Sequence, residues 1–176
     1  MLQNSEILFT RRSIRKYKKD KPVSDDVVGF ILDAAMCAPS ARNKQPWHFL
    51  VTRNRQKLDK LSELHPYGKM LKDATMAVMV CGDTKLEERE SALALNGAAA
   101  TQNLLLAAHS AGLGAVWLGM YPRKERADAM REVFDYPENI IPVSLISIGY
   151  PAEEKPRNNN FKPERIHLEK WGENWQ

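Results

Sequence analysis

The pattern of apolar and polar positions along the 176-residue chain predicts a mixture of helices and short buried strands. Apolar side chains that recur three and four positions apart indicate helices, whereas short apolar runs bounded by turn residues indicate strands. Helices are expected over residues up to about 9, 24–38, 58–64, 91–111 and 123–134. Strands are expected over residues 47–52, 75–81, the later part of 112–119, and 141–148.

Four residues should mark the ends of these elements. Ser24, followed by two aspartates, is expected to cap the second helix, because its hydroxyl can accept from the first turn while the carboxylates face the positive end of the dipole. Pro39 should stop that helix, and Gly112 should end the long helix expected over residues 91–111. Pro142 should stand at the start of the last strand.

The long helix is apolar or small almost all round between Gly97 and Ala108. A helix without a polar face lies inside a protein or in a contact between subunits. The glycine-rich stretch after it, Gly112–Gly119, is partly like a dinucleotide-binding fingerprint, but it follows a helix and enters a strand. The fingerprint requires the reverse order, so a Rossmann site is rejected.

From Gly149 onward the composition changes to proline-rich and polar, with three consecutive asparagines at 158–160. This composition predicts an extended arm with little core of its own. Trp171 and Trp175 near its end argue against simple disorder, because large aromatic groups usually cover a surface. Residues 1–176 are therefore expected to form one domain, with residues from about 150 to 176 as an arm that docks on a surface, a partner subunit being one candidate.

The charge is unevenly distributed. The chain has 26 Lys and Arg against 22 Asp and Glu, a net charge of +4. Seven basic residues and one acidic residue lie between Arg11 and Lys21, so the other residues hold 19 basic and 21 acidic side chains, a net charge of −2. A local excess fits one bound anionic group better than a broad basic face for a nucleic acid. No nucleic-acid partner is expected.

Other signals narrow the class of protein. Cys37 and Cys81 form no Cys-x-x-Cys pair, so both are expected to be core thiols, and no metal site is expected. The polar residues among the first nine and the lack of 18 unbroken apolar residues predict a cytoplasmic protein without membrane contact. The scattered histidines and the lack of a Gly-x-Ser-x-Gly motif indicate no catalytic side chain, so each histidine is expected to complete a local hydrogen bond.

Two stretches carry candidate binding chemistry. Arg11–Tyr17 places three guanidinium groups and a serine hydroxyl within five residues, which indicates either an anion site or a solvated basic segment. Ala38–Pro46 precedes a strand-like run, and its Asn43 and Gln45 amides could recognise the edge of a heterocycle. Taken alone, the second stretch is better explained as an ordinary connection whose amides satisfy nearby backbone groups.

Taken together, six stretches resemble the FMN-dependent nitroreductase family in the same order and at similar separations. They cover nearly the whole chain, and they are Arg11–Tyr17, Ala38–Phe49, Asp73–Ala74, Gly97–Leu106, Gly112–Gly119 and Ile148–Pro151. The resemblance implies an α+β fold with a central, mostly antiparallel sheet flanked by helices. It also implies an intertwined homodimer with exchanged carboxyl-terminal arms and FMN sites at the subunit interface.

The resemblance also assigns roles to residues, with the flavin N5 rather than a side chain as the reactive centre. The residues expected to bind FMN are Arg11, Arg12, Ser13, Arg15, Pro39, Ser40, Ala41, Asn43, Lys69, Leu118, Gly119 and Met120. The stretch around Ser40 would come from the partner subunit, and Arg42 and Tyr67 are expected near the substrate. A basic residue that commonly completes the phosphate site is replaced here by Asn160; Lys155, Arg157, Lys162 or Arg165 could substitute.

The activity implied by the resemblance is a ping-pong oxidoreductase. It would take hydride from NADH or NADPH and reduce electron-poor acceptors such as nitroaromatics, quinones or enones. Two alternatives stay open at this stage. The same scaffold supports reductive dehalogenation and other flavin chemistry, and the chain could instead be a flavin-binding protein without turnover.

Overall fold

The computed structural model describes residues 5–19 and 21–175. Its centre is a sheet of four strands, in the order β1-β2-β4-β3, in which every neighbouring pair is antiparallel. The strands are β1 (Trp47–Thr52), β2 (Met76–Asp83), β3 (Gly114–Gly119) and β4 (Ile140–Gly149). The predicted α+β class and the predicted antiparallel sheet are therefore confirmed.

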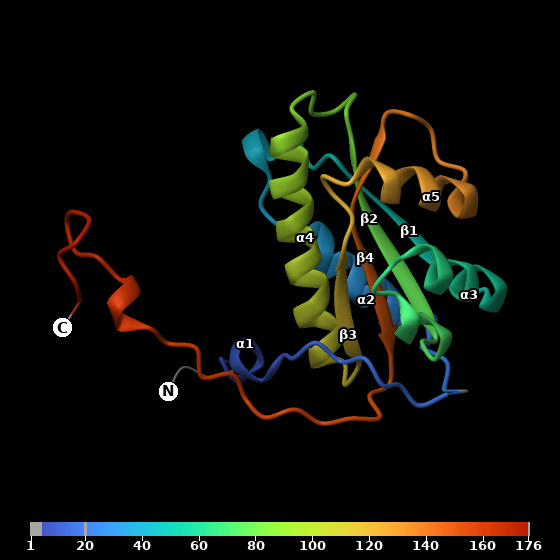
Figure 1. Ribbon diagram of the computed structural model, residues 1–176, viewed down its shortest axis with the longest axis horizontal. Helices are drawn as coiled ribbons and strands as arrows, with labels where there is room; N and C mark the ends of the chain where they lie inside the picture. Colours follow the sequence, from blue (N-terminus) through green and yellow to red (C-terminus); the bar gives the residue numbers. More distant parts are fainter. Residues whose placement is uncertain (1–4, 20, 176) are drawn as a thin grey trace.

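Helices cover both faces of this sheet (Figure 1). The short helix α1 precedes them, and three 3-10 turns complete the chain at Ala41–Asn43, Lys69–Lys72 and Pro163–Arg165. The bounds of the α-helices are α1 (Glu6–Thr10), α2 (Asp25–Met36), α3 (Arg55–Leu64), α4 (Glu90–Ser110) and α5 (Lys124–Phe134). No helix within residues 5–19 and 21–175 is long and apolar enough to cross a membrane.

Strand β2 divides the hydrophobic core into two layers. Successive side chains of a strand point to opposite faces of the sheet, so both faces of a central strand can be buried. Met76, Val78 and Val80 pack against α2 and α4. Ala77, Met79 and Cys81 pack against α3 and α5. This double burial explains why the run is apolar without alternation.

Three local predictions differ from the structure. Ser24 precedes α2 in an extended conformation, but its side chain makes no capping hydrogen bond. Pro142 lies inside β4 opposite Cys81, where the register shifts, because an irregularity in the ladder tolerates a residue without an N–H. Cys37 is exposed rather than buried, since it follows the last turn of α2, whereas Cys81 is buried as predicted. Gly112 ends α4 as predicted, with a φ of 73°.

The carboxyl-terminal arm has two parts. From Tyr150 to Asn158 it runs beside the segment around α1, and the N–H groups of Lys18 and Asn158 bond the carbonyls of Tyr150 and Phe9 across the two segments. Beyond this point the arm turns away from the body of the molecule (Figure 1). The outer part carries exposed aromatic groups, and the side chain of Trp171 is 88% exposed. Within residues 150–175 the structure contains no α-helix, and the helical turn there is the 3-10 turn Pro163–Arg165.

Candidate functional site

The basic segment after α1 lies on the outer edge of the sheet. Ser13 forms a parallel bridge with Ala115 of β3, and the N–H of Ile14 donates to the Ala115 carbonyl at 3.0 Å. Ile14 is buried against Gly114, where an added Cβ would stand 2.6 Å from Ile14 Cγ2. A glycine at position 114 therefore lets the segment approach the strand. The arginines on either side of Ile14 are held at a fixed place on the edge.

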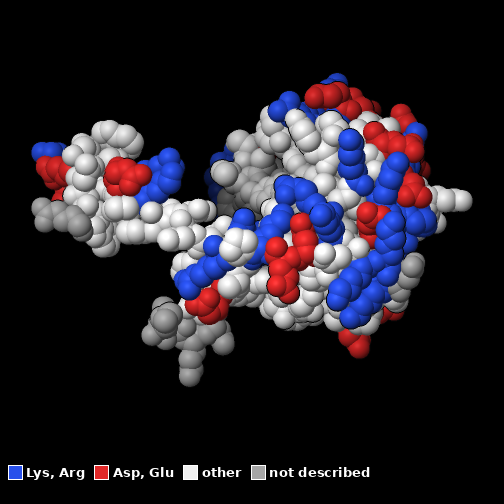
Figure 2. Space-filling view, turned by 60° about the horizontal axis from the view of Figure 1, so that its bottom comes forward, with Lys and Arg blue, Asp and Glu red and all other residues white. Residues whose placement is uncertain are grey.

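The arm supplies a cation and a carboxylate to this segment. The Lys155 Nζ lies 2.5 Å from the Ser13 carbonyl oxygen, and the Arg12 guanidinium donates to the Pro156 carbonyl. Glu153 accepts from the N–H groups of Arg15 and Lys16 at 2.5 and 3.2 Å. The Arg15 N–H above all, with Lys155 nearby, lowers the pKa of Glu153. Figure 2 shows this side of the molecule, with Lys and Arg gathered near the base of the arm and carboxylates between them.

These contacts distinguish the four cations that could replace the basic residue expected at Asn160. Lys155 reaches the basic segment directly. Arg157 instead pairs with Glu6 at 3.2 Å and lies over the ring of Phe9. Lys162 and Arg165 belong to the outer part of the arm, at the turn Pro163–Arg165. Sequence reasoning found no signal for Glu153, because a carboxylate bound by backbone N–H groups has no residue pattern of its own.

The other end of β3 forms an open corner. Leu118 and Met120 are buried and hold the strand in the core, whereas Gly119 between them is exposed. A Cβ added at Gly119 would meet no atom within 4 Å, so there is free space beside this residue. Because β3 is an edge strand, alternate backbone groups of this strand point outward from the sheet.

His65 and Arg126 converge on this corner. The Nε2 of His65 lies 3.2 Å from the Gly119 carbonyl oxygen, and Arg126 donates to the same oxygen at 2.6 Å. The N–H of Tyr67 donates to the His65 Nδ1 at 3.2 Å. Nδ1 is therefore an acceptor and Nε2 carries the proton, which describes a neutral imidazole. Burial, reinforced by Arg126 and opposed by the Gly119 bond, lowers the pKa of His65.

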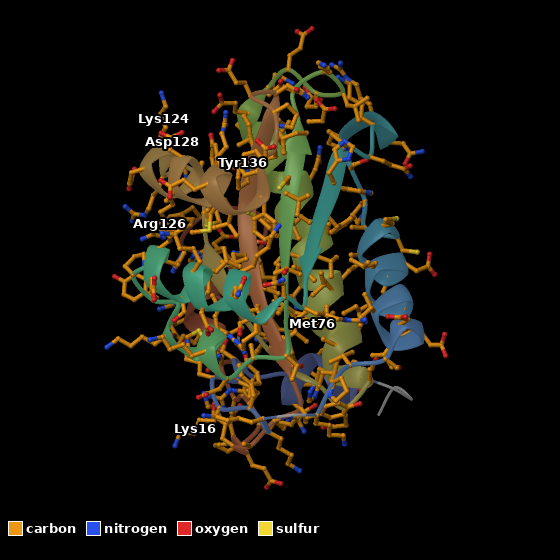
Figure 3. The ribbon with its side chains drawn as sticks, turned by 90° about the vertical axis from the view of Figure 1, so that its right-hand side faces the viewer. Lys16, Met76, Lys124, Arg126, Asp128 and Tyr136 are labelled. Carbon is orange, nitrogen blue, oxygen red and sulfur yellow. The ribbon has the colours of Figure 1, made fainter. Side chains whose placement is uncertain are left out.

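The loop after α3 thus brings Tyr67 toward the end of β3. The side chain of Tyr67 is 69% exposed, and its ring centre lies 5.8 Å from the Arg126 Cζ. Figure 3 shows Arg126 between α5 and α3, on the side where this loop leaves α3. Sequence reasoning placed Tyr67, Lys69 and Gly119 in one site but missed His65 and Arg126. A histidine in a turn and an arginine on an amphipathic helix carry no pattern that distinguishes them from surface residues.

The loop that contains Pro39, Ser40, Ala41, Arg42 and Asn43 lies elsewhere. The N–H of Ala41 donates to Asn96 near the start of α4, whereas Thr10, next to the basic segment, bonds His109 near its end. These two contacts are 13 residues apart on one helix, or about 20 Å along its axis. The chain therefore does not join this loop to its own basic segment.

The loop is locally strained and firmly anchored. Arg42, Asn43 and Gln45 have φ angles of 56°, 53° and 46°, a region that side chains other than glycine rarely occupy. The Gln45 amide donates to Asn43 Oδ1 at 3.1 Å, so the two amides satisfy one another in part. The adjacent Lys44 reaches Glu87 at 3.2 Å, which ties the loop to the segment before α4.

We expect Glu87 to make the stability of the protein depend on acid pH. Its side chain is only 2% exposed, and hydrogen bonds from Arg89 first, with Lys44, lower its pKa from 4.5 to about 2. A lowered pKa stabilises the fold above pH 4.5, and this contribution is lost as the pH falls from 4.5 toward 2. Unfolding midpoints measured across this range should fall more steeply for the wild type than for Glu87→Gln. Parallel curves would contradict the assignment.

The geometry of this edge specifies the shape of a ligand. Ser13 bridges β3 at Ala115, and Gly119 lies four residues further along, about 13 Å away in an extended strand. A ligand that contacts both places needs an anionic group at one end and a group that can bond the outward backbone of an edge strand at the other. FMN has a phosphate and a planar ring system in this arrangement. The donor set around Ser13 and the open space at Gly119 therefore both fit FMN.

Comparison with known proteins gives the family. The family model described as "Nitroreductase family" matches residues 8–65 and 62–150. The chain belongs to this family. An archaeal relative from Methanothermobacter thermautotrophicus, provisionally named an NADH dehydrogenase/NAD(P)H nitroreductase, is 52% identical over 166 residues, which are 94% of this chain and 86% of the relative.

Solved structures of nitroreductase-family proteins agree with this assignment. A crystal structure from Parabacteroides distasonis, with the same provisional name, has a TM-score of 0.92 and 39% identity and covers 97% of this chain and 100% of its own. A nitroreductase from Desulfovibrio desulfuricans, solved in complex with FMN, has a TM-score of 0.83 and 32% identity over 97% and 99% of the two chains. At the level of the family, the predicted oxidoreductase class and the predicted cofactors are confirmed.

Proposed function

We propose that this nitroreductase-family protein binds FMN along β3 and reduces electron-poor acceptors, such as nitroaromatics, quinones or enones, with NADH or NADPH in a ping-pong cycle. When bound, FMN supplies the centre that accepts a hydride from the nicotinamide and returns electrons to the acceptor. One observation carries the proposal: a single edge strand joins an anion-binding segment at Ala115 to open space and outward backbone groups at Gly119.

The residues of the basic segment bind the phosphate end of the cofactor. Guanidinium groups offer pairs of donors that match phosphate oxygens, so Arg11 and Arg15 supply charge and direction. The Ser13 hydroxyl adds a donor, and Lys155 of the arm takes the place of the basic residue missing at Asn160. Arg12 has a mixed role, because its guanidinium also fastens the arm through the Pro156 carbonyl.

The opposite end of the site orients the ring. The buried side chains of Leu118 and Met120 fix the end of β3, so that the backbone at Gly119 meets the ring edge near the reacting nitrogen. Lys69, which begins the turn after the Tyr67 loop, provides positive charge near the polar edge of the ring. Preorganised donors of this kind stabilise the negative charge that accompanies reduction.

We further propose that two copies of the chain share each site. The loop from Pro39 to Asn43 then covers the cofactor of the other copy, as the family resemblance implies; within one chain the loop lies about 20 Å along α4 from the contact beside the basic segment. Exposed apolar groups on α2 and α4, among them Phe30 and Leu95, supply a contact surface. The outer arm with Trp171 wraps the partner. Arg42 of one copy and Tyr67 of the other would face the acceptor.

The function is tested by flavin binding followed by anaerobic reduction. We expect the protein to retain FMN with a yellow absorbance, and expect that colour to bleach on mixing with NADH or NADPH and to return when a quinone or nitroaromatic is added. A protein that binds no FMN contradicts the whole proposal. A protein that binds FMN but is not bleached by either nicotinamide is a flavin-binding protein without this activity.

A further inference from the structure

His65 contacts three parts of the proposed site, two through its ring and one through its backbone carbonyl. Its side chain is only 1% exposed, although the loop that carries it lies on the surface. Nε2 reaches the Gly119 carbonyl of β3, and Nδ1 accepts from the Tyr67 N–H. The His65 carbonyl accepts from the N–H of Gly68 at 2.8 Å, which sets the turn that leads into Lys69. One residue thus links the proposed substrate loop to the proposed ring-binding corner.

We propose that His65 is a positioning residue whose neutral imidazole, acting with Arg126, holds the Gly119 peptide and the Tyr67–Lys69 loop in the arrangement needed for FMN binding and reduction. This inference rests on the proposed function, and it names a residue that the family resemblance did not assign. His65 acts through the backbone groups that it holds, so it is not a catalytic residue in the sense of contacting the reacting atoms.

Gly119 needs contacts that fix its backbone because it is a glycine at the end of an edge strand. Glycine has no Cβ to restrict its backbone, so a glycine at the exposed end of an edge strand rotates more freely than any other residue. The carbonyl of Gly119 accepts from His65 at 3.2 Å and from Arg126 at 2.6 Å. Two donors from different elements fix this carbonyl and thereby the orientation of its peptide. The outward backbone of Gly119 is then fixed beside the space proposed for the ring.

The turn around Gly68 also helps to hold His65 and the following loop in place. A Cβ at Gly68 would lie 3.0 Å from the His65 carbonyl oxygen and 3.1 Å from the Leu61 carbonyl oxygen. The backbone therefore closes tightly over the end of α3, and the imidazole is enclosed beneath it. Since both ring nitrogens are engaged, a flip of the ring would put a C–H group in place of each nitrogen and break both bonds.

Charge on the imidazole would undo this arrangement. An imidazolium has two N–H donors, so it cannot accept from the Tyr67 N–H. The guanidinium of Arg126, from α5, already occupies the same carbonyl, and its charge opposes a second positive charge. The other ionisable group facing His65 is the Tyr67 phenol, whose ring centre lies 6.2 Å from the imidazole. The low pKa of His65 agrees with a ring that works only in the neutral form.

Two isosteric variants separate the two bonds. His65→Gln can retain a donor toward the Gly119 carbonyl and loses the acceptor at Nδ1, whereas His65→Asn can retain the acceptor for Tyr67 and loses the donor. We expect His65→Asn to slow anaerobic flavin reduction by NADH or NADPH roughly tenfold and to weaken FMN binding, because a buried carbonyl loses a partner. We expect His65→Gln to stay within about threefold in reduction rate and to show mainly a raised KM for the acceptor.

Three further measurements separate positioning from a merely structural role. Arg126→Gln, at a half-buried and therefore tolerant position, should slow reduction in the same direction as His65→Asn. The reduction rate of the wild type should fall on its acid side as His65 becomes protonated, and both His65 variants should lack this fall. The matched control His48→Gln changes an exposed histidine beside Asp83 and should leave rate, pH profile and FMN affinity unchanged.

The outcomes are distinguishable from failure of the proposed function. If the wild type binds no FMN, the proposed function itself is wrong. If it binds and is reduced, but His65→Asn and Arg126→Gln keep wild-type rates, affinities and pH profiles, the positioning role is wrong. Should the His65 variants fail to fold, nitrogen NMR of the wild type decides. A neutral ring protonated on Nε2 supports the proposal, and a ring protonated on Nδ1 or charged at neutral pH overturns it.

Discussion

Replacing Arg11 and Arg15 together by alanine should weaken FMN binding by about 100-fold or more while the unfolding midpoint stays close to that of the wild type. A hydrogen bond to a charged group contributes about 1.5–3 kcal/mol, and two such contacts to one phosphate account for this loss. The bonds that hold these residues in the fold use backbone N–H groups: Arg11 donates to the Ile7 carbonyl and Arg15 to Glu153. Both bonds survive substitution by alanine.

The matched control is Lys16→Ala with Lys18→Ala. These two lysines lie in the same segment and are exposed, so the double variant removes the same number of positive charges. Equilibrium titration with FMN, followed by flavin fluorescence, should show near wild-type affinity for the control. Equal weakening in both double variants would mean that only the general positive field matters. Unchanged affinity in the arginine variant would place the phosphate elsewhere.

The second large effect is expected at Gly114. Its substitution by alanine places a Cβ 2.6 Å from Ile14 Cγ2 and 2.8 Å from Ile14 Cβ, so the basic segment must move away from β3. Overpacking of this kind destabilises a protein by about 1–3 kcal/mol, which corresponds to a melting temperature lower by about 2–10 °C in a chain of this size. FMN binding should weaken as well, because the arginines move with the segment.

Gly119→Ala is the contrasting variant on the same strand. A Cβ there meets no atom within 4 Å, so thermal unfolding should be close to that of the wild type. FMN affinity and the rate of flavin reduction should nevertheless fall, because the methyl group occupies the space proposed for the ring. Calorimetry together with FMN titration separates the two effects. If Gly114→Ala were as stable as the wild type, the segment would not be held as the structure indicates.

Most elements of the fold were predictable because each leaves a local signature in the sequence. The strand Trp47–Thr52 and the helix Glu90–Ser110 occur where the pattern placed them, within one residue. Both predictions rest on the burial of one or two faces of the element, and the spacing of apolar residues along the sequence indicates such burial directly. The capping by Ser24 and the burial of Cys37 were wrong, since both depend on an end of the helix, the first at its start and the second after its last turn, rather than on its repeating face.

The candidate site was predictable only in part, because it is assembled from distant segments. Arg11–Arg15 and Gly119 form motifs, and the structure brings both to one strand edge. Lys155, Glu153 and His65 contribute through contacts to backbone atoms, which almost any residue type at the contacted position could provide. Such contacts leave no pattern in the sequence of the segment that is contacted. They become visible only when the fold sets two segments side by side.

The placement of β3 at the margin of the sheet has a consequence for solubility. An open strand edge is a template on which another chain can add a strand and begin aggregation. Here the backbone at Ala115 is occupied by the segment through Ile14, and the carbonyl of Gly119 is occupied by His65 and Arg126. Only a short run around Trp117 stays between the two blocked positions. The residues proposed to arrange a cofactor site therefore also shield the β3 edge of the sheet against strand addition.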